Sequence, residues 1–252
     1  MSALAVTALM LLAAAPCDAQ KYKVAKVERT RILIDKRWDA EPDAEAARFI
    51  APYQQKVDSV MGPVVGTTAH EMHRHRPESE LSNLLCDILV WGGKMLGEEP
   101  VFAVYNLGGI RSSLPKGKIT VGDVNDMAPF ENKICFLTLT GDKVMELFRQ
   151  IAHRGGEGVS HAVKMVITRD GQLKSVTLNG EPIDPNKSYR VATLDYLAEG
   201  NDQLTAFKSG TDVVAPKEKE HNVRYIIMDY FREMQKQGKS VESKIEGRCT
   251  VE

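Results

Sequence analysis

The sequence has little of what marks several large classes of protein. Its 252 residues hold four cysteines and no C-x-x-C pair, so neither a disulfide scaffold nor a zinc finger is indicated. Its 33 Lys and Arg residues balance 34 Asp and Glu residues without forming a basic block, so we expect no nucleic-acid polymer among its partners. The apolar stretch 3–15 is short for a bilayer, so we expect no transmembrane segment.

Catalytic motifs are equally scarce. The chain contains no G-x-S-x-G elbow and no phosphate loop of the form G-x-x-x-x-G-K-[ST]. The segment "HEMHRH" offers His70, Glu71, His73 and His75, but a zinc protease needs its two histidines four residues apart on a helix. A solvated polar loop is the more common form of such a segment. We therefore expect no metal site in this chain and keep an autonomous metal-dependent hydrolase as the weakest alternative.

The first 19 residues resemble a secretory signal. An apolar stretch is followed by "CDA" directly before Gln20, which is similar to a small-x-Ala cleavage site. Cys17 leaves a lipid-modified cysteine as the other route of export. We expect a signal peptide over residues 1–19, an N-terminal arm over 20–37, and a periplasmic or cell-surface location.

Hydrophobic spacing predicts a mixed α/β (α+β) fold, in which a mixed sheet with hairpins packs against helices. Strands are predicted in "VVGTTAHEM", "PVFAVY", "KICFLTLTG" and "SYRVATL", and a hairpin turns at Asp170-Gly171. The segment "KVERTRILID" is expected to be a strand or an arm. Ser79 is a candidate N-cap. The apolar faces of the predicted helices, all of which we expect to be packed, are Ile50, Tyr53, Val57 and Val60; Leu81, Leu84, Leu85, Ile88 and Leu89; Val144, Leu147, Phe148 and Ile151; and Val223, Ile226, Ile227, Tyr230, Phe231 and Met234.

The stretch "YNLGGIR" stands out because it follows a buried strand. Gly108 and Gly109 allow a ligand to approach bare backbone, and Asn106 offers a donor and an acceptor. Arg111 adds a planar fork that matches phosphate or carboxylate. A tight turn with a surface arginine is the alternative, so the loop by itself leaves binding open.

The motifs around this loop closely resemble the C-terminal domain of the 5'-nucleotidase and UDP-sugar hydrolase family. An N-x-G-G-I-R loop precedes "GKIT", "PFEN" and "LTLTG" in the family's order, and "ESELSNLL" and "YRVATLDYLAEGND" are similar to two further family segments. The resemblance runs from about Trp38 to Arg248. It implies a domain over residues 38–252 that binds the nucleoside part of a nucleotide.

The resemblance also implies roles for individual residues. Phe130 is placed as a ring that stacks on the base, Asn106 as the residue that hydrogen-bonds the base edge, and Arg111 as a phosphate contact. A further family arginine corresponds to Arg74 or Arg76, and the spacing does not decide between them.

Two departures from the family pattern limit what is implied. Leu204 stands where the family has its second ring, so either that ring is missing or Phe207 replaces it. The family's metallophosphatase motifs, D-x-H and G-N-H-[DE], are absent from the sequence. We therefore expect no cofactor in this chain and two divalent metals in a separate metallophosphatase partner. The expected function is substrate recognition in a split, exported 5'-nucleotidase, and the alternative is a secreted nucleotide-binding or nucleoside-binding module.

Overall fold

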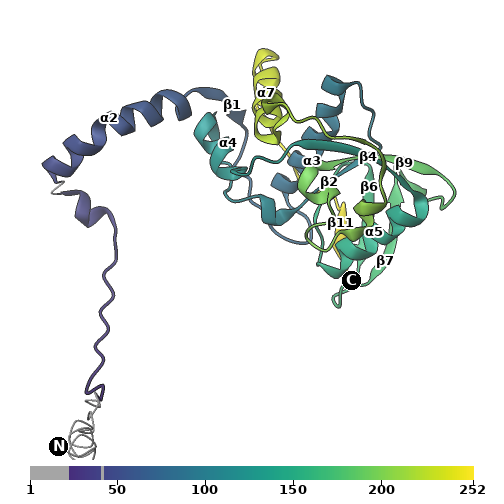
Figure 1. Ribbon diagram of the computed structural model, residues 1–252, viewed down its shortest axis with the longest axis horizontal. Helices are drawn as coiled ribbons and strands as arrows, with labels where there is room; N and C mark the ends of the chain where they lie inside the picture. The colour runs from purple at the N-terminus through teal and green to yellow at the C-terminus, as the bar shows by residue number, and fades with distance from the viewer. Residues whose placement is uncertain (1–22, 41–42) are drawn as a thin grey trace, which may run out of the picture. The chain divides into compact units, whose positions relative to one another are not determined.

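The computed structural model of the protein describes residues 23–40 and 43–252 (Figure 1). Contacts within the chain define two units, Met1–Phe49 and Ile50–Glu252. The predicted signal peptide and Cys17 lie outside the described residues. Within the described part of the chain, no helix combines the length and apolarity that crossing a membrane requires.

The second unit mixes helices and strands, as the sequence predicts. The α-helices are α2 (Ala44–Met61), which the two units share, α3 (Glu80–Gly93), α4 (Val121–Met127), α5 (Gly141–His153), α6 (Asp195–Ala198) and α7 (Val223–Lys236). The strands are β1 (Val64–Thr68), β2 (Phe102–Tyr105), β3 (Gly117–Thr120), β4 (Ile134–Thr140), β5 (Gly158–Val159), β6 (Val163–Ile167), β7 (Leu173–Leu178), β8 (Glu181–Pro182), β9 (Ser188–Leu194), β10 (Thr211–Val214) and β11 (Cys249–Val251). Short 3-10 helices occupy η1 (Lys36–Ala40), η2 (Lys94–Leu96), η3 (Leu107–Gly109), η4 (Thr205–Ser209) and η5 (Lys219–His221).

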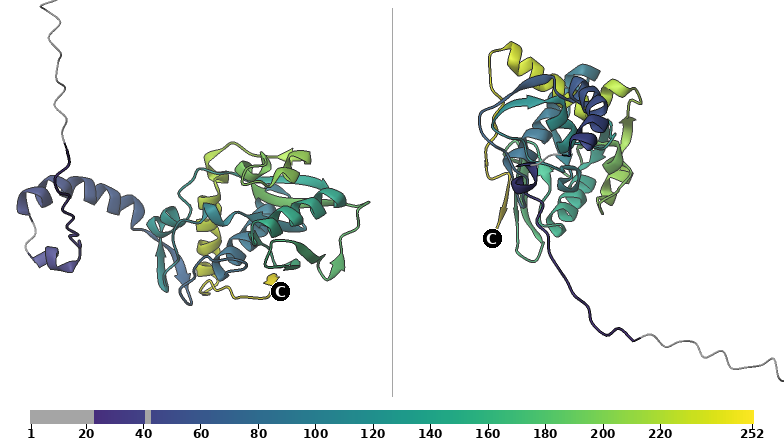
Figure 2. Two further views of the ribbon diagram at one scale, coloured as in Figure 1. Left: turned by 90° about the horizontal axis from the view of Figure 1, so that it is seen from below. Right: turned by 90° about the vertical axis from the view of Figure 1, so that its left-hand side faces the viewer.

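The described strands form three sheets. The central sheet has the order β10-β4-β9-β2-β5, in which β2 and β9 run parallel and the other pairs run antiparallel. A second sheet has the order β11-β6-β7-β8, and β1 pairs with β3. Helices α3 and α5 both pack on the central sheet, and α7 packs on α3 and β1 (Figure 2). The expected mixed α/β fold with hairpins and packed helices is confirmed.

Helix α3 begins where the sequence predicts. The hydroxyl of Ser79 accepts a hydrogen bond from the backbone N–H of Ser82, and the Ser82 hydroxyl in turn accepts one from the N–H of Ser79. This reciprocal pair satisfies donors that the first helical turn leaves open. The predicted apolar face is fully buried, and Cys86 lies within it.

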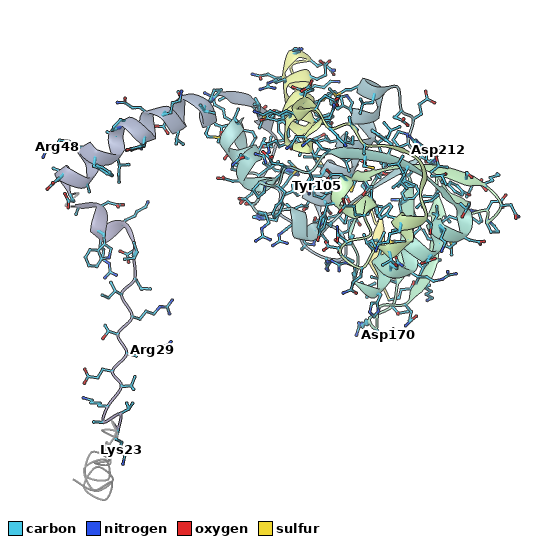
Figure 3. All side chains as sticks on the ribbon, in the orientation of Figure 1. Lys23, Arg29, Arg48, Tyr105, Asp170 and Asp212 are labelled. Carbon is cyan, nitrogen blue, oxygen red and sulfur yellow. The ribbon has the colours of Figure 1, made fainter. Side chains whose placement is uncertain are left out.

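The hairpin of β6 and β7 also confirms its prediction. Asp170 and Gly171 form the turn, and Gly171 adopts φ of 82°, a conformation that glycine adopts without strain. Asp170 is labelled at the tip of this hairpin in Figure 3.

The last strand is held in place by an arginine. Arg248 is 2% exposed, and its guanidinium donates to both carboxylate oxygens of Asp87 at 2.9 and 2.6 Å and to the backbone oxygen of Val159 at 3.0 Å. The residue therefore ties β11 to α3 and β5.

One expectation for the N-terminal part, the packing of the first predicted helix, is wrong. Helix α2 is present, but none of its residues is buried, and the side chain of Tyr53 on its apolar face is 65% exposed. Periodicity shows that a face is apolar, whereas burial requires a surface that covers it. The segment "KVERTRILID" forms no regular strand over its described residues, which leaves the arm as the remaining interpretation.

Candidate functional site

The loop after β2 is largely buried at its start and is bonded to a distant segment of the chain. Tyr105, labelled in Figure 3, ends the strand, and Asn106 is 4% exposed. The amide nitrogen of Asn106 donates to Asp202 Oδ2 at 2.7 Å, whereas its Oδ1 is buried without a hydrogen-bond partner. A Cβ on Gly109 would lie 2.8 Å from that Oδ1. A larger residue at position 109 would therefore force Asn106 or the loop to shift.

Phe130 projects from a segment that is fastened to the start of α7. Arg224 Nη2 donates to the backbone oxygen of Pro129 at 2.7 Å, and the N–H of Val223 donates to the backbone oxygen of Asn132 at 2.9 Å. Phe130 nevertheless keeps 47% of its surface exposed. Phe130 is therefore a half-exposed aromatic ring on a fixed backbone, and the guanidinium carbon of Arg111 lies over it at 5.9 Å from the ring centroid.

A second exposed ring comes from the segment after β9. Tyr196 is 38% exposed, and its hydroxyl donates to Asp202 Oδ1 at 3.1 Å. Partial loss of hydration and this contact with Asp202 raise the pKa of Tyr196. Asp202 thus accepts from Tyr196 with one oxygen and from Asn106 with the other, and this links the two segments.

These three segments enclose a cavity of about 360 Å³, which we call the ring cavity. Its size fits a small-molecule ligand. It combines two aromatic rings with two amides, one arginine and one carboxylate. Its lining residues are Asn106, Gly108, Gly109, Arg111, Phe130, Asn132, Tyr196 and Asp202.

A second cavity of about 370 Å³ adjoins the first, and we call it the arginine cavity. The two share Gly108 in their walls. The arginine cavity is lined by Arg74, His75, Arg76, Leu107, Gly108 and Arg154. Guanidinium groups gathered in this way match the geometry and charge of a phosphate.

A buried carboxylate fixes the arginine cavity. The Glu157 side chain has no exposed surface, and it accepts from Arg76 at 2.6 Å, from Arg154 at 2.7 Å and from the N–H of Leu107 at 2.6 Å. Arg74 donates to the backbone oxygen of Leu107 at 3.0 Å. Glu157 therefore connects the arginines to the same loop that lines the ring cavity.

The structure brings the predicted binding residues to adjoining positions. Asn106, Gly108, Gly109, Arg111 and Phe130 line the ring cavity, while Arg74 and Arg76 both line the arginine cavity. Sequence spacing left the choice between these two arginines open, and the fold places both beside Gly108.

Neither candidate for the second ring reaches the cavity. Leu204 has no exposed surface and Phe207 is 1% exposed, and both belong to the hydrophobic core. The second ring that lines the cavity is instead that of Tyr196. The sequence did not indicate Tyr196, because it lies within the matched segment "YRVATLDYLAEGND", in which nothing distinguishes it as a binding residue.

Four other polar residues of the site were also missed, and one of them is Asn132 in the motif "PFEN". Asp202, Arg154 and Glu157 follow strand or helix ends in the stretches "EGND" and "HRGGEG". Charged residues beside glycines after a regular element are the signal that identifies such loops. Asp202 meets Asn106 across 96 residues of sequence and Glu157 meets Leu107 across 50, and sequence spacing does not reveal such contacts.

The "HEMHRH" segment forms no metal centre in the described structure. His73 Nε2 lies 3.3 Å from Glu71 Oε1, and His75 Nε2 lies 4.0 Å from Glu80 Oε2, all in side chains that are partly or largely exposed. Across the described ranges, His, Cys, Asp and Glu side chains do not gather in a group of three or more that could hold a metal ion. The autonomous metal-dependent hydrolase thus lacks a ligand set here.

Comparison with known proteins identifies the family. The family described as 5'-nucleotidase, C-terminal domain, matches residues 64–209. The chain belongs to this family. The match contains both cavities and every residue that lines them.

Individual relatives of this 5'-nucleotidase C-terminal domain agree. The UshA protein of Yersinia enterocolitica is 27% identical over 185 residues, and UshA of Escherichia coli K12 is 29% identical over 157 residues. These alignments cover 72% and 61% of this chain but only 34% and 28% of the two relatives. The chain therefore spans about a third of the length of these curated relatives.

A solved structure shows the same fold. The 5'-nucleotidase precursor of Thermus thermophilus superposes with a TM-score of 0.72 at 28% identity. The match covers 84% of this chain and 44% of the Thermus chain.

Proposed function

We propose that this chain recognises nucleotides for hydrolysis by a metallophosphatase carried on a separate polypeptide. The observation that carries the proposal is the pair of adjoining cavities, one with aromatic rings and amides and the other with arginines. A nucleotide has the same division between a planar base and an anionic phosphate.

The base is assigned to the ring cavity. Phe130 and Tyr196 offer exposed rings, and stacking of a base on an aromatic side chain contributes about 1–3 kcal/mol. The side-chain amide of Asn132 makes no hydrogen bond within the described structure, so it is free to bond the base edge. We assign donation to the base edge to Asn132, because the amide nitrogen of Asn106 is already bonded to Asp202. Asn106 keeps the predicted base-edge role through its Oδ1, which has no partner, and its nitrogen holds Asp202.

The phosphate is assigned to the arginines. Arg74, Arg76 and Arg154 line one cavity and Arg111 lines the other, and Gly108 between them lets the ligand lie close to the backbone. Hydrogen bonds to charged groups are worth about 1.5–3 kcal/mol each. The arginines thus supply affinity for the anion, and the rings supply affinity for the base.

Catalysis is assigned to the partner. The family resemblance implies two divalent metals in a metallophosphatase, and the motifs that bind them are not in this sequence. A signal over residues 1–19, an arm over 20–37 and a recognition domain over 38–252 complete the proposal, with export to the periplasm or cell surface.

Calorimetric titration tests the binding part. We expect AMP to bind, and we expect Phe130→Ala to weaken AMP by about 5- to 150-fold, the equivalent of losing one stacked base. Arg149→Ala, which removes an exposed arginine of α5 outside both cavities, serves as the control and should leave the affinity unchanged. Absence of AMP binding, or equal effects of both substitutions, would contradict the proposal.

A reconstitution experiment tests the catalytic part. We expect the purified chain to increase AMP turnover by a co-expressed metallophosphatase, and Phe130→Ala to reduce that increase. AMP binding with no complex and no effect on turnover would favour the alternative, a binding module without a hydrolytic partner.

A further inference from the structure

Arg111 covers the ring that is assigned to the base. Its guanidinium carbon lies over Phe130 at 5.9 Å from the ring centroid, and both residues line the ring cavity. A cation over an aromatic face at this distance is attracted by the ring. Since both residues line this cavity, a ligand that enters it and stacks on this face of Phe130 meets the guanidinium.

The spacing leaves no room for a base between them. Stacked carbon atoms approach to about 3.5–4.0 Å, so a planar ring between two flanking groups needs about 7–8 Å. The observed 5.9 Å is smaller. A base can stack on this face of Phe130 only after the guanidinium has moved away.

Only the Arg111 side chain has to move. Its backbone N–H donates to the oxygen of Met127 at 2.8 Å, which fixes the main chain. Beyond the ring, the described contact of its guanidinium is a hydrogen bond of 3.4 Å to the backbone oxygen of Gly108, near the limit for such a bond. A long, exposed side chain held in this way can rotate toward an anion at little cost.

We propose that Arg111 is a specificity-determining residue that makes base stacking depend on an anionic group in the same ligand. A phosphate draws the guanidinium off Phe130 and bonds it, so the uncovering of the ring is offset by a charged hydrogen bond. A neutral nucleoside has to displace the guanidinium without gaining a charged hydrogen bond in exchange. The residue thus favours nucleotides over nucleosides, and this inference rests on the proposed function.

The decisive variant is Arg111→Ala, titrated with AMP and with adenosine. AMP should bind at least about tenfold more weakly, because a charged hydrogen bond is lost. Adenosine should bind about two- to fivefold more tightly, because no cation has to leave the ring. Opposite changes from one substitution are the expected signature, since general damage to the site would weaken both ligands.

Two further variants complete the experiment. In a Phe130→Ala background, Arg111→Ala should no longer improve adenosine binding, because there is no ring left to cover. Arg149→Ala should change neither ligand. If Arg111→Ala weakens both ligands equally or leaves adenosine unchanged, the inference is overturned.

The failure of this inference differs from the failure of the proposed function. If AMP binds and depends on Phe130 but the opposite changes are missing, recognition stands and the role of Arg111 as a cover falls. If neither AMP nor adenosine binds the unmodified chain, the proposed function itself falls, and the inference with it.

Discussion

Two adjacent glycines in the loop after β2 show how much a single residue's surroundings decide. A Cβ on Gly109 would meet Asn106 Oδ1 at 2.8 Å and Tyr105 Cε1 at 3.2 Å, whereas the nearest atoms to a Cβ on Gly108 are 3.7 Å away. The neighbours of Gly109 are buried in the core or the cavity wall. The two positions carry the same residue, but only at Gly109 do neighbouring atoms leave too little space for a Cβ.

This contrast predicts different results for two alanine variants. Gly109→Ala should lower the free energy of unfolding by about 1–3 kcal/mol, because overpacking forces the loop to shift. Gly108→Ala should change it by less than about 0.5 kcal/mol. Chemical denaturation of the two variants measures the difference, and equal stabilities would show that the loop yields freely.

Burial also determines the chemistry of the cysteines at this scale. Loss of hydration raises the pKa of the Cys135 thiol to about 11 and that of Cys249 to about 12, and it raises the pKa of Cys86 as well. The thiolate is the reactive form, so these side chains stay protonated and unreactive near neutral pH.

A labelling experiment checks the state of these thiols. In a Cys17→Ser variant at pH 8, much less than one thiol per chain of the native protein should react with an aromatic disulfide reagent. In the protein unfolded in guanidinium, three thiols per chain should react. Reactivity should rise as the pH approaches the raised values. Fast, complete labelling of the native protein at pH 8 would rule out this degree of burial.

At the scale of elements, two amphipathic helices with similar patterns have different surroundings. Val57 on α2 is 56% exposed, whereas Ile227 on α7 has no exposed surface. Helix α7 packs on α3 and β1, and it also carries Arg224, which holds the Phe130 segment. An apolar stripe predicts that a helix has a face to bury, but it does not say whether the fold covers that face.

Matched truncations of these two helices should therefore differ strongly. Val57→Ala should change the free energy of unfolding by less than about 0.5 kcal/mol. Ile227→Ala should lower it by about 2–5 kcal/mol through lost burial and the cavity left behind. Denaturant titrations measure both values, and a large loss for Val57→Ala would show that its face is covered in solution.

The whole molecule divides unevenly between its N-terminal segment and the folded domain. None of the described residues from 23 to 61 is buried, whereas the core lies between Val65 and Cys249. The C-terminal end belongs to this core because Arg248 ties β11 to α3. Stability is therefore expected to reside in residues 62–252.

A fragment of residues 62–252 should unfold cooperatively within about 2–4 °C of the full chain, the shift that about 1 kcal/mol produces in a domain of this size. A fragment of residues 62–246, which lacks Arg248 and β11, should lose much more. It leaves the partly buried Asp87 and the oxygen of Val159 without their partner. Calorimetry separates the two, and an equal fall in both fragments would mean that the N-terminal segment contributes to folding.

Local patterns in the chain were sufficient to predict the family, the mixed α/β fold and most of the elements, because neighbouring residues carry this information. Ser79 marked the start of α3, and Asp170-Gly171 marked the hairpin. The N-x-G-G-I-R loop and the family motifs around it also indicated Asn106, Gly108, Gly109, Arg111 and Phe130, all of which lie in one cavity wall.

Long-range packing settled which residues complete that site. Leu204 and Phe207 are in the core, whereas Tyr196 lines the cavity, because side-chain direction after β9 depends on how the segment packs. Glu157 joins Arg76, Arg154 and Leu107 across up to 81 residues of sequence. The guanidinium of Arg111 likewise lies over the ring of Phe130, which belongs to a later segment of the chain. Such contacts depend on how segments that are distant in the sequence pack together, and no local sequence pattern encodes this.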